Sequence, residues 1–77
     1  MGAETRIEDL LRAGFPGDEV AATDRTGGGD HFQVTVVSPR FDGLSLVEQH
    51  KLVYAALAEP LADGTIHELR ISTKGLE

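Results

Sequence analysis

Residues 32–57, FQVTVVSPRFDGLSLVEQHKLVYAAL, carry the strongest structural pattern in this 77-residue chain. In the first part of the segment, the apolar residues Phe32, Val34 and Val36 alternate with polar residues. This period of two is typical of a strand with one buried face. Pro39 follows and has no backbone N–H group to give to a sheet, so the strand should end before it. The segment therefore begins with a predicted strand and a turn.

The second part of the segment predicts a helix that begins near Leu46. Ser45 and Glu48 have the spacing of a capping box, in which each side chain binds a backbone N–H group that the helix start leaves without a partner. Apolar and histidine side chains then recur at steps of three and four, which predicts one buried helical stripe. The stripe consists of Leu46, His50, Val53, Tyr54, Leu57 and Leu61. We expect it to cover the buried face of the preceding strand.

A second helix is predicted near the N-terminus. Thr5 and Glu8 form another apparent capping box, and the apolar residues that follow predict a helix over residues 6–13. Phe15 is expected to anchor the next turn in the core. At the other end of the central helix, Pro60 should end or bend the helix because its ring clashes with the preceding turn.

Two more strands complete the predicted sheet. Residues 19–24 should form a strand antiparallel to the one that starts at Phe32, and the glycine-rich segment 25–31 suits a hairpin loop. Residues 65–73 should form a third strand, parallel to the strand before the helix. Its inward face is expected to carry His67, Leu69 and Ile71. The sequence thus predicts an α+β fold of order α-β-β-α-β, a three-stranded mixed sheet with both helices on one face.

Composition limits the function classes that are open to the chain. At 77 residues it should form a single domain, residues 1–77, too small for a large enclosed pocket. The absence of cysteine excludes disulfides, thiolate metal sites and a cysteine nucleophile. Because the sequence has neither a signal-peptide pattern nor an apolar run of about 20 residues, we expect a cytoplasmic protein with no membrane segment.

Charge argues against nucleic-acid binding. Acidic residues outnumber lysine and arginine by 13 to 7, whereas neutralisation of phosphates requires basic side chains. A local basic patch is still conceivable, and its candidate members are Arg40, Lys51, Arg70 and Lys74. The glycine run at residues 27–29 is not a phosphate-binding loop, because it leads into a strand and no Lys-Ser or Lys-Thr pair follows it.

Three histidines are the side chains best suited to metal or proton chemistry. His50 lies on the apolar helical stripe, which favours a structural role. His31 lies at the mouth of the glycine-rich loop and should point toward the outer side of the sheet or into the loop, because the neighbouring Phe32 points into the core. His67 opens the third predicted strand. Their spacing matches no local metal-ligand pattern, so from the residues alone each histidine is open to a structural or a functional role.

Five motifs, taken together and in order, resemble the BolA family over nearly the whole chain. They are GDHFQV at residues 29–34, VVS at 36–38, FDG at 41–43, QHKLVYAAL at 49–57 and IHEL at 66–69. The family's fold is α+β and related to the type II KH domain, in agreement with the pattern above. One departure is Gln49 before His50, where the family often has arginine.

The resemblance implies a binding module rather than an enzyme. Members of the family pair with monothiol glutaredoxins, and the pair shares a 2Fe-2S cluster ligated by the glutaredoxin cysteine, by glutathione and by histidine. The isolated protein is expected to carry no cofactor. The family's ligand histidine lies in its Ile-His motif, which corresponds to His67 in this chain. A second family ligand, a cysteine or a histidine, lies in the first hairpin loop. Because this loop has no cysteine, the second ligand would be His31, or the chain has none. Imidazole can replace thiolate on one iron and makes such a cluster easier to reduce. Acidification should weaken this ligation because only neutral imidazole binds iron.

Two other functions remain open at this point. Members of the family are often described as transcriptional regulators, so the alternative expectation is a KH-like surface that binds DNA through the four basic residues named above. KH domains use a GxxG loop for nucleic-acid contacts, and this sequence has none. The third possibility is a stand-alone structural domain or a homodimer. Of the partners considered, DNA is the one that the net charge of −6 disfavours.

Overall fold

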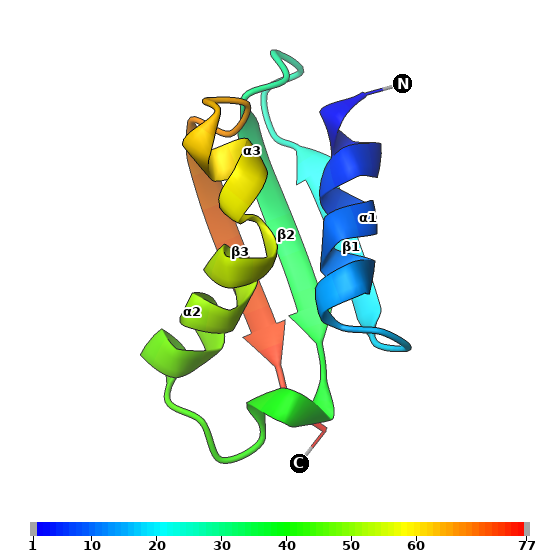
Figure 1. Ribbon diagram of the computed structural model, residues 1–77, viewed down its shortest axis with the longest axis vertical. Coiled ribbons are helices and arrows are strands. Elements are labelled where there is room, and N and C mark those ends of the chain that lie inside the picture. Colours follow the sequence, from blue (N-terminus) through cyan, green and yellow to red (C-terminus); the bar gives the residue numbers. More distant parts are fainter. Residues whose placement is uncertain (1, 77) are drawn as a thin grey trace.

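The chain forms the predicted series of a helix, two strands, a helix and a strand. The structure is a computed structural model and describes residues 2–76 (Figure 1). Its elements are α1 (Ala3–Gly14), β1 (Glu19–Asp24), β2 (His31–Val37), the short 3-10 helix η1 (Pro39–Phe41), α2 (Leu46–Ala56), α3 (Ala58–Ala62) and β3 (Glu68–Lys74). The strand order is β1-β2-β3, with β1 antiparallel and β3 parallel to β2. The predicted α+β fold with a mixed sheet is confirmed.

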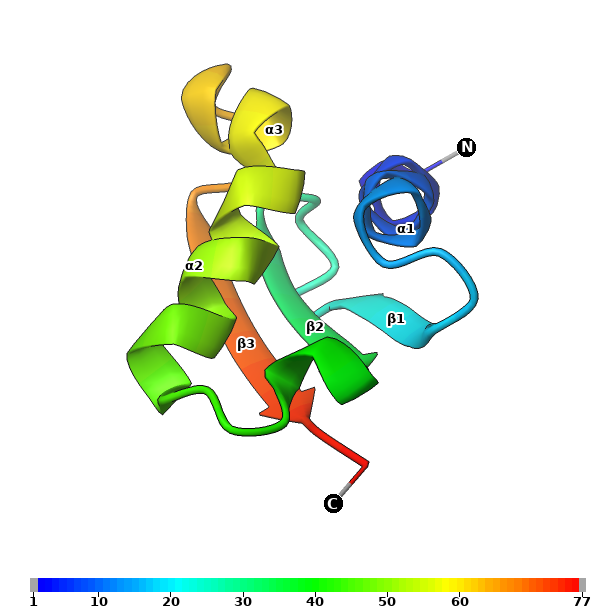
Figure 2. The same cartoon turned by 60° about the horizontal axis from the view of Figure 1, so that its bottom comes forward.

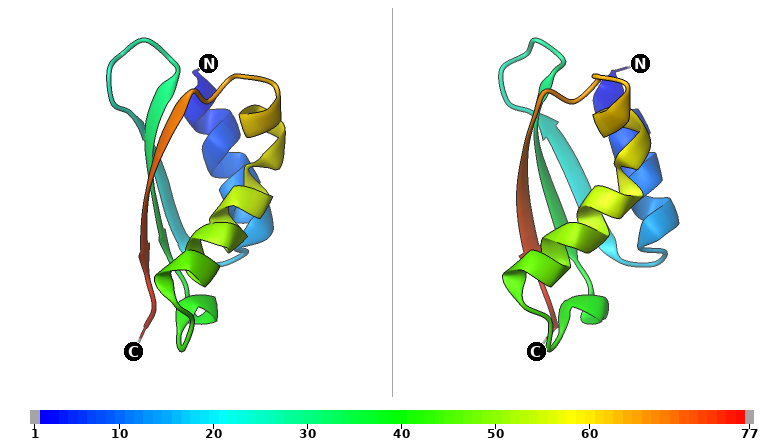
Figure 3. Two further views of the ribbon diagram at one scale, coloured as in Figure 1. Left: turned by 90° about the vertical axis from the view of Figure 1, so that its left-hand side faces the viewer. Right: turned by 60° about the vertical axis from the view of Figure 1, so that its left-hand side comes forward.

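All the helices lie on one face of the sheet, as Figures 2 and 3 show, and the other face is left uncovered. The central strand β2 turns its alternate residues inward, and Phe32, Val34 and Val36 are completely buried. The same core contains Ile7, Leu11, Phe15, Phe41, Val53, Leu57 and Ile66. Within residues 2–76, no helix has the length and apolar character needed to cross a membrane.

The two predicted capping boxes have opposite outcomes. At α2 the Ser45 hydroxyl accepts from the Glu48 N–H, and the Glu48 carboxylate accepts from the Ser45 N–H, as predicted. At α1 the prediction is wrong, because the helix starts three residues earlier than residue 6 and has Gly2 at its N-cap. Glu8 instead accepts a hydrogen bond from the Ala22 N–H at 3.1 Å. This contact satisfies a backbone donor on the edge strand β1, which a cap at Thr5 would not do.

The predicted apolar stripe of α2 is only partly buried. Val53 and Leu57 are completely buried, but Leu46 and Tyr54 are 62% and 46% exposed. Helix α2 is rotated about its axis relative to the predicted stripe, because the Gln49 side chain points inward. Its amide donates to the Leu44 carbonyl at 3.0 Å, and its side-chain oxygen accepts from the Thr73 hydroxyl on β3.

The remaining differences lie at the ends of elements. α2 stops at Ala56, and Pro60 lies inside the separate short helix α3. The break precedes the proline because its ring would meet the carbonyl four residues earlier, that of Ala56. β3 starts at Glu68 rather than at residue 65, because the Asp63 carboxylate accepts from the Thr65 N–H and holds the preceding residues in a turn.

Candidate metal-ligand site

Parallel pairing of β2 and β3 brings His31 and His67 to the same end of the sheet. His31 is the first residue of β2 and pairs with Glu68, the first residue of β3. The carbonyl of Asp30 accepts hydrogen bonds from the His67 and Glu68 N–H groups at 2.8 and 3.2 Å. The hairpin loop and the turn that enters β3 therefore lie side by side, at the upper end of Figure 1.

The two imidazoles approach the same carboxylate. His67 Nδ1 lies 3.3 Å from Asp30 Oδ2, and His31 Nε2 lies 3.9 Å from the same oxygen. The other ring nitrogen of His31, Nδ1, lies 3.0 Å from Glu68 Oε2. The exposed fractions of the side chains are 36% for His31 and 64% for His67, so a second molecule can reach both rings.

The inward orientation predicted for His67 is wrong, whereas the outward orientation of His31 is confirmed. The core position at this end of the sheet is taken by Ile66, which is 4% exposed. Because the turn continues to His67, this residue does not share the inward face of β3 with Leu69 and Ile71. The imidazole is consequently free of the core and points to solvent.

The glycine-rich hairpin is held in place by the carboxylate of Asp24. One of its oxygens accepts from the N–H groups of Thr26 and Gly27, and the other accepts from Gly29 at 2.9 Å. Gly27 and Gly29 have φ angles of 77° and 81°, which side-chain-bearing residues rarely adopt. The loop is thus an ordered turn that delivers Asp30 and His31 to the site.

Two arginine side chains lie close to Glu68, the second carboxylate of the site. Glu68 Oε1 lies 3.1 Å from the Arg25 guanidinium and 3.6 Å from Arg70 Nε. At the entry to the site, hydrogen bonds from the Thr65 hydroxyl and N–H hold the pKa of Asp63 below its usual range. These contacts fix the turn that carries His67.

The third histidine is not part of this site. His50 is half-buried on α2, as the apolar stripe predicted. Within residues 2–76, no three histidine or carboxylate side chains are grouped closely enough to hold a metal ion by themselves. The site can offer imidazole nitrogens, but a complete set of ligands has to include groups from another molecule.

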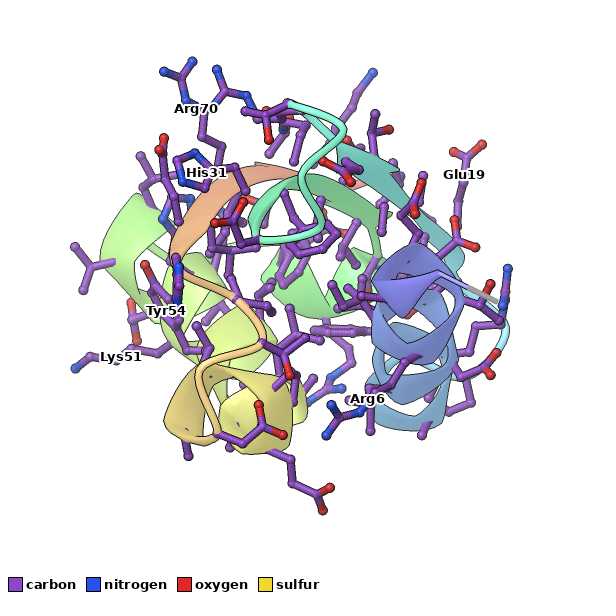
Figure 4. All side chains as sticks on the ribbon, turned by 90° about the horizontal axis from the view of Figure 1, so that it is seen from above. Arg6, Glu19, His31, Lys51, Tyr54 and Arg70 are labelled. Carbon is purple, nitrogen blue, oxygen red and sulfur yellow. The ribbon has the colours of Figure 1, made fainter. Side chains whose placement is uncertain are left out.

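The four basic residues do not form a single patch. Arg40 donates to the Gly14 carbonyl at 2.5 Å and lies over the Phe15 ring, next to α1. Arg70 and Lys74 belong to the outer face of the sheet, whereas Lys51 projects from α2 on the helix side, as Figure 4 shows for Arg70 and Lys51.

Comparison with known proteins agrees with the motifs and the fold. The family model described as BolA-like protein matches residues 16–77. This chain belongs to the BolA family. Among BolA-family relatives, the DNA-binding transcriptional regulator BolA of Escherichia coli is 36% identical over 80 residues, covering 95% of this chain and 75% of that protein. Human BolA-like protein 1 is 52% identical over 48 residues, which are 62% of this chain and 34% of that protein.

The fold of BolA proteins extends over nearly the whole chain. The structure of BolA1 from Arabidopsis thaliana matches with a TM-score of 0.86 and 31% identity, over 99% of this chain and 94% of that one. The three-stranded sheet with helices on one face is therefore the BolA fold.

Sequence reasoning missed the two carboxylates of the site. Asp30 and Glu68 are direct neighbours of His31 and His67 in the sequence, and that adjacency was the available signal. In this BolA-family chain the register of β2 and β3 brings His67 to Asp30, and the register is known only from the fold.

Proposed function

We propose that this protein is a non-enzymatic partner of a monothiol glutaredoxin and contributes histidine ligation to a 2Fe-2S cluster shared by the two proteins. The observation that supports the proposal is the approach of two solvent-accessible imidazoles to one carboxylate oxygen, from segments 36 residues apart at a single end of the sheet. The proposal includes a role in iron-sulfur trafficking or iron sensing, and a location in the cytoplasm.

The donor set fits a shared cluster better than a resident one. Imidazole nitrogen replaces thiolate on one iron in Rieske-type centres. The chain has no cysteine, so any thiolate ligand has to come from another molecule. In the proposed complex, as the family resemblance implies, these ligands are the glutaredoxin cysteine and glutathione. When bound, the cluster supplies one-electron chemistry or an exchangeable iron-sulfur unit. The chain's own part is to hold the histidine side chains at an accessible edge.

His67 is the better ligand of the two histidines. Its side chain is the more exposed, and of the carboxylates in residues 2–76 only that of Asp30 forms an ion pair with it, at Nδ1. Both nitrogens of His31 lie near carboxylates, so His31 would have to leave Asp30 or Glu68 to bind iron. We therefore assign His67 as the ligand and His31 as the candidate for a second one.

Reconstitution tests this proposal. The protein is mixed with a monothiol glutaredoxin, glutathione, iron and sulfide, and visible absorption and circular dichroism are compared with those of the glutaredoxin alone. We expect a different spectrum for the mixture, which His67→Ala abolishes and His50→Ala leaves intact. A mixture that gives the glutaredoxin spectrum, or a His67→Ala variant that changes nothing, would falsify the proposal.

DNA binding is the second candidate, favoured by the name of the E. coli relative. Titration of duplex DNA at about 50 and about 200 mM salt separates the two functions, because phosphate contacts weaken steeply over this range. With a net charge of −6 and basic residues on separate surfaces, we expect no measurable binding at the higher salt. Tight binding there that Arg70→Ala or Lys51→Ala weakens would favour the regulator.

A further inference from the structure

We infer that Asp30 is the positioning residue of the site: it keeps the proton of His67 on Nδ1 and so leaves Nε2 as the atom that binds iron. This inference rests on the proposed cluster ligation and names a residue that acts through the ligand rather than as one.

Asp30 holds His67 at two points. Its carbonyl accepts from the His67 N–H at 2.8 Å, which fixes the main chain. Its carboxylate lies 3.3 Å from His67 Nδ1, within ion-pair distance of that ring nitrogen. The His67 side chain is 64% exposed, so its neighbours in the protein are few and the carboxylate of Asp30 is the charged group beside its ring.

The chemistry of the contact selects one ring nitrogen. A neutral imidazole carries a proton on one nitrogen and a lone pair on the other. An ionised carboxylate attracts an N–H group and repels a lone pair, so the ring nitrogen 3.3 Å from Asp30 is the one that keeps the proton. The lone pair then lies on Nε2. Metal-binding histidines commonly have this arrangement, with a carboxylate on the nitrogen that does not bind the metal.

His31 differs because both of its ring nitrogens lie near carboxylates. Its Nδ1 lies 3.0 Å from Glu68, and its Nε2 faces Asp30 at 3.9 Å. Within residues 2–76, no ion pair is formed by Nε2 of His67. Asp30 therefore leaves His67, but not His31, with a nitrogen directed away from the carboxylates of the site.

The first test uses the protein without any cluster. Nitrogen-15 NMR at about pH 8, where an ordinary histidine is neutral, reports which ring nitrogen carries the proton. We expect the Nδ1–H form of His67 to dominate in the wild type and to lose its dominance in Asp30→Ala, which keeps the backbone carbonyl. Asp18→Ala, far from the site in the turn before β1, serves as the control. A wild-type His67 that is mainly Nε2–H, or an unchanged ratio in Asp30→Ala, overturns the inference.

The second test uses the reconstituted complex with the glutaredoxin. Loss of this kind of outer contact typically weakens metal binding by about 10- to 100-fold. Asp30→Ala should therefore lose its cluster to a chelator about 10 to 100 times faster than the wild type, and Asp18→Ala at the wild-type rate. Equal rates for Asp30→Ala and wild type overturn the inference while the proposed function stands. If His67→Ala leaves the spectrum unchanged, the proposed function fails instead, and the cluster part of the inference fails with it.

Discussion

At the scale of single residues, the site depends on a few side chains that bind backbone groups. Asp24 shapes the hairpin, Asp63 shapes the turn before β3, and Asp30 joins the two. The carboxylates of Asp24 and Asp63 accept hydrogen bonds over a short stretch of chain, whereas Asp30 joins the hairpin to the turn before β3 through its backbone carbonyl. Local contacts therefore shape the two turns that carry the histidines.

Removal of the Asp24 carboxylate should loosen the hairpin. In Asp24→Ala, three backbone N–H groups lose their acceptor, and we expect a loss of about 1–2 kcal/mol in the free energy of unfolding, because these groups can partly turn to water. Urea denaturation measures this change. Asp18→Ala is the matched control, and an equal effect of the two substitutions would contradict the role assigned to Asp24.

The turn that carries His67 should weaken in acid. The Thr65 hydroxyl and N–H groups lower the folded-state pKa of Asp63, so its carboxylate stabilises the fold above its unfolded-state pKa. This contribution disappears as the pH falls through the lower, folded-state value. We expect Asp63→Asn to have a lower urea midpoint than the wild type at about pH 6 and an equal one near pH 2, since both side chains are then neutral. A difference that persists at the acidic end would contradict this assignment.

His31 and His67 stand out in the sequence as candidate ligands, whereas the carboxylates that lie beside them in the structure do not. The outward direction of His31 followed from the alternation that buries Phe32. The direction of His67 did not follow, because no strand pattern applies to a residue that still belongs to a turn. The contacts of Asp30 and Glu68 depend on strand register, which sequence neighbours do not specify.

At the scale of elements, the capping-box pattern predicts the helix start correctly only where its glutamate has no other backbone N–H group to bind. Ser45 and Glu48 bind each other's backbone, whereas Glu8 serves strand β1. The start of α1 was misjudged because the nearby edge strand offers an unpaired N–H group. The rotation of α2 was missed for a similar reason, since Gln49 contacts segments that are distant in the sequence.

These assignments predict different costs for two similar substitutions. Ser45→Ala removes a true N-cap and should lower the free energy of unfolding by about 1 kcal/mol. Thr5→Ala replaces a residue in the first turns of α1 with a better helix former, so it should change stability by less than about 0.5 kcal/mol. Thermal or urea denaturation of both variants measures the difference. Equal losses of unfolding free energy in the two variants would indicate that Thr5 caps α1 after all.

At the scale of the whole molecule, stability rests on one small core beneath a single layer of helices. Leu11 is completely buried, and Leu11→Ala should cost about 2–5 kcal/mol. Leu46 is 62% exposed, so Leu46→Ala should stay within about 0.5 kcal/mol. Comparison of the two urea midpoints tests this assignment of the core. A large loss in Leu46→Ala would show that the predicted stripe of α2 is buried after all.

The fold could be predicted almost completely because one strand and one helix carry clear periodicities, and the parallel crossover leaves few ways to connect them. The same crossover places the starts of β2 and β3 side by side, so the whole fold determines where the histidines meet.

The most direct measurement of the central claim is pulsed electron paramagnetic resonance on the reduced complex with a glutaredoxin. Nitrogen-15 is introduced only into the histidines of this chain, so any strong coupling from that label must come from one of its imidazoles. We expect such a coupling in the wild type and in His50→Ala, and its loss in His67→Ala. A reduced cluster with no histidine coupling in the wild type, or with the same coupling in His67→Ala, would contradict the assignment of His67 as the ligand.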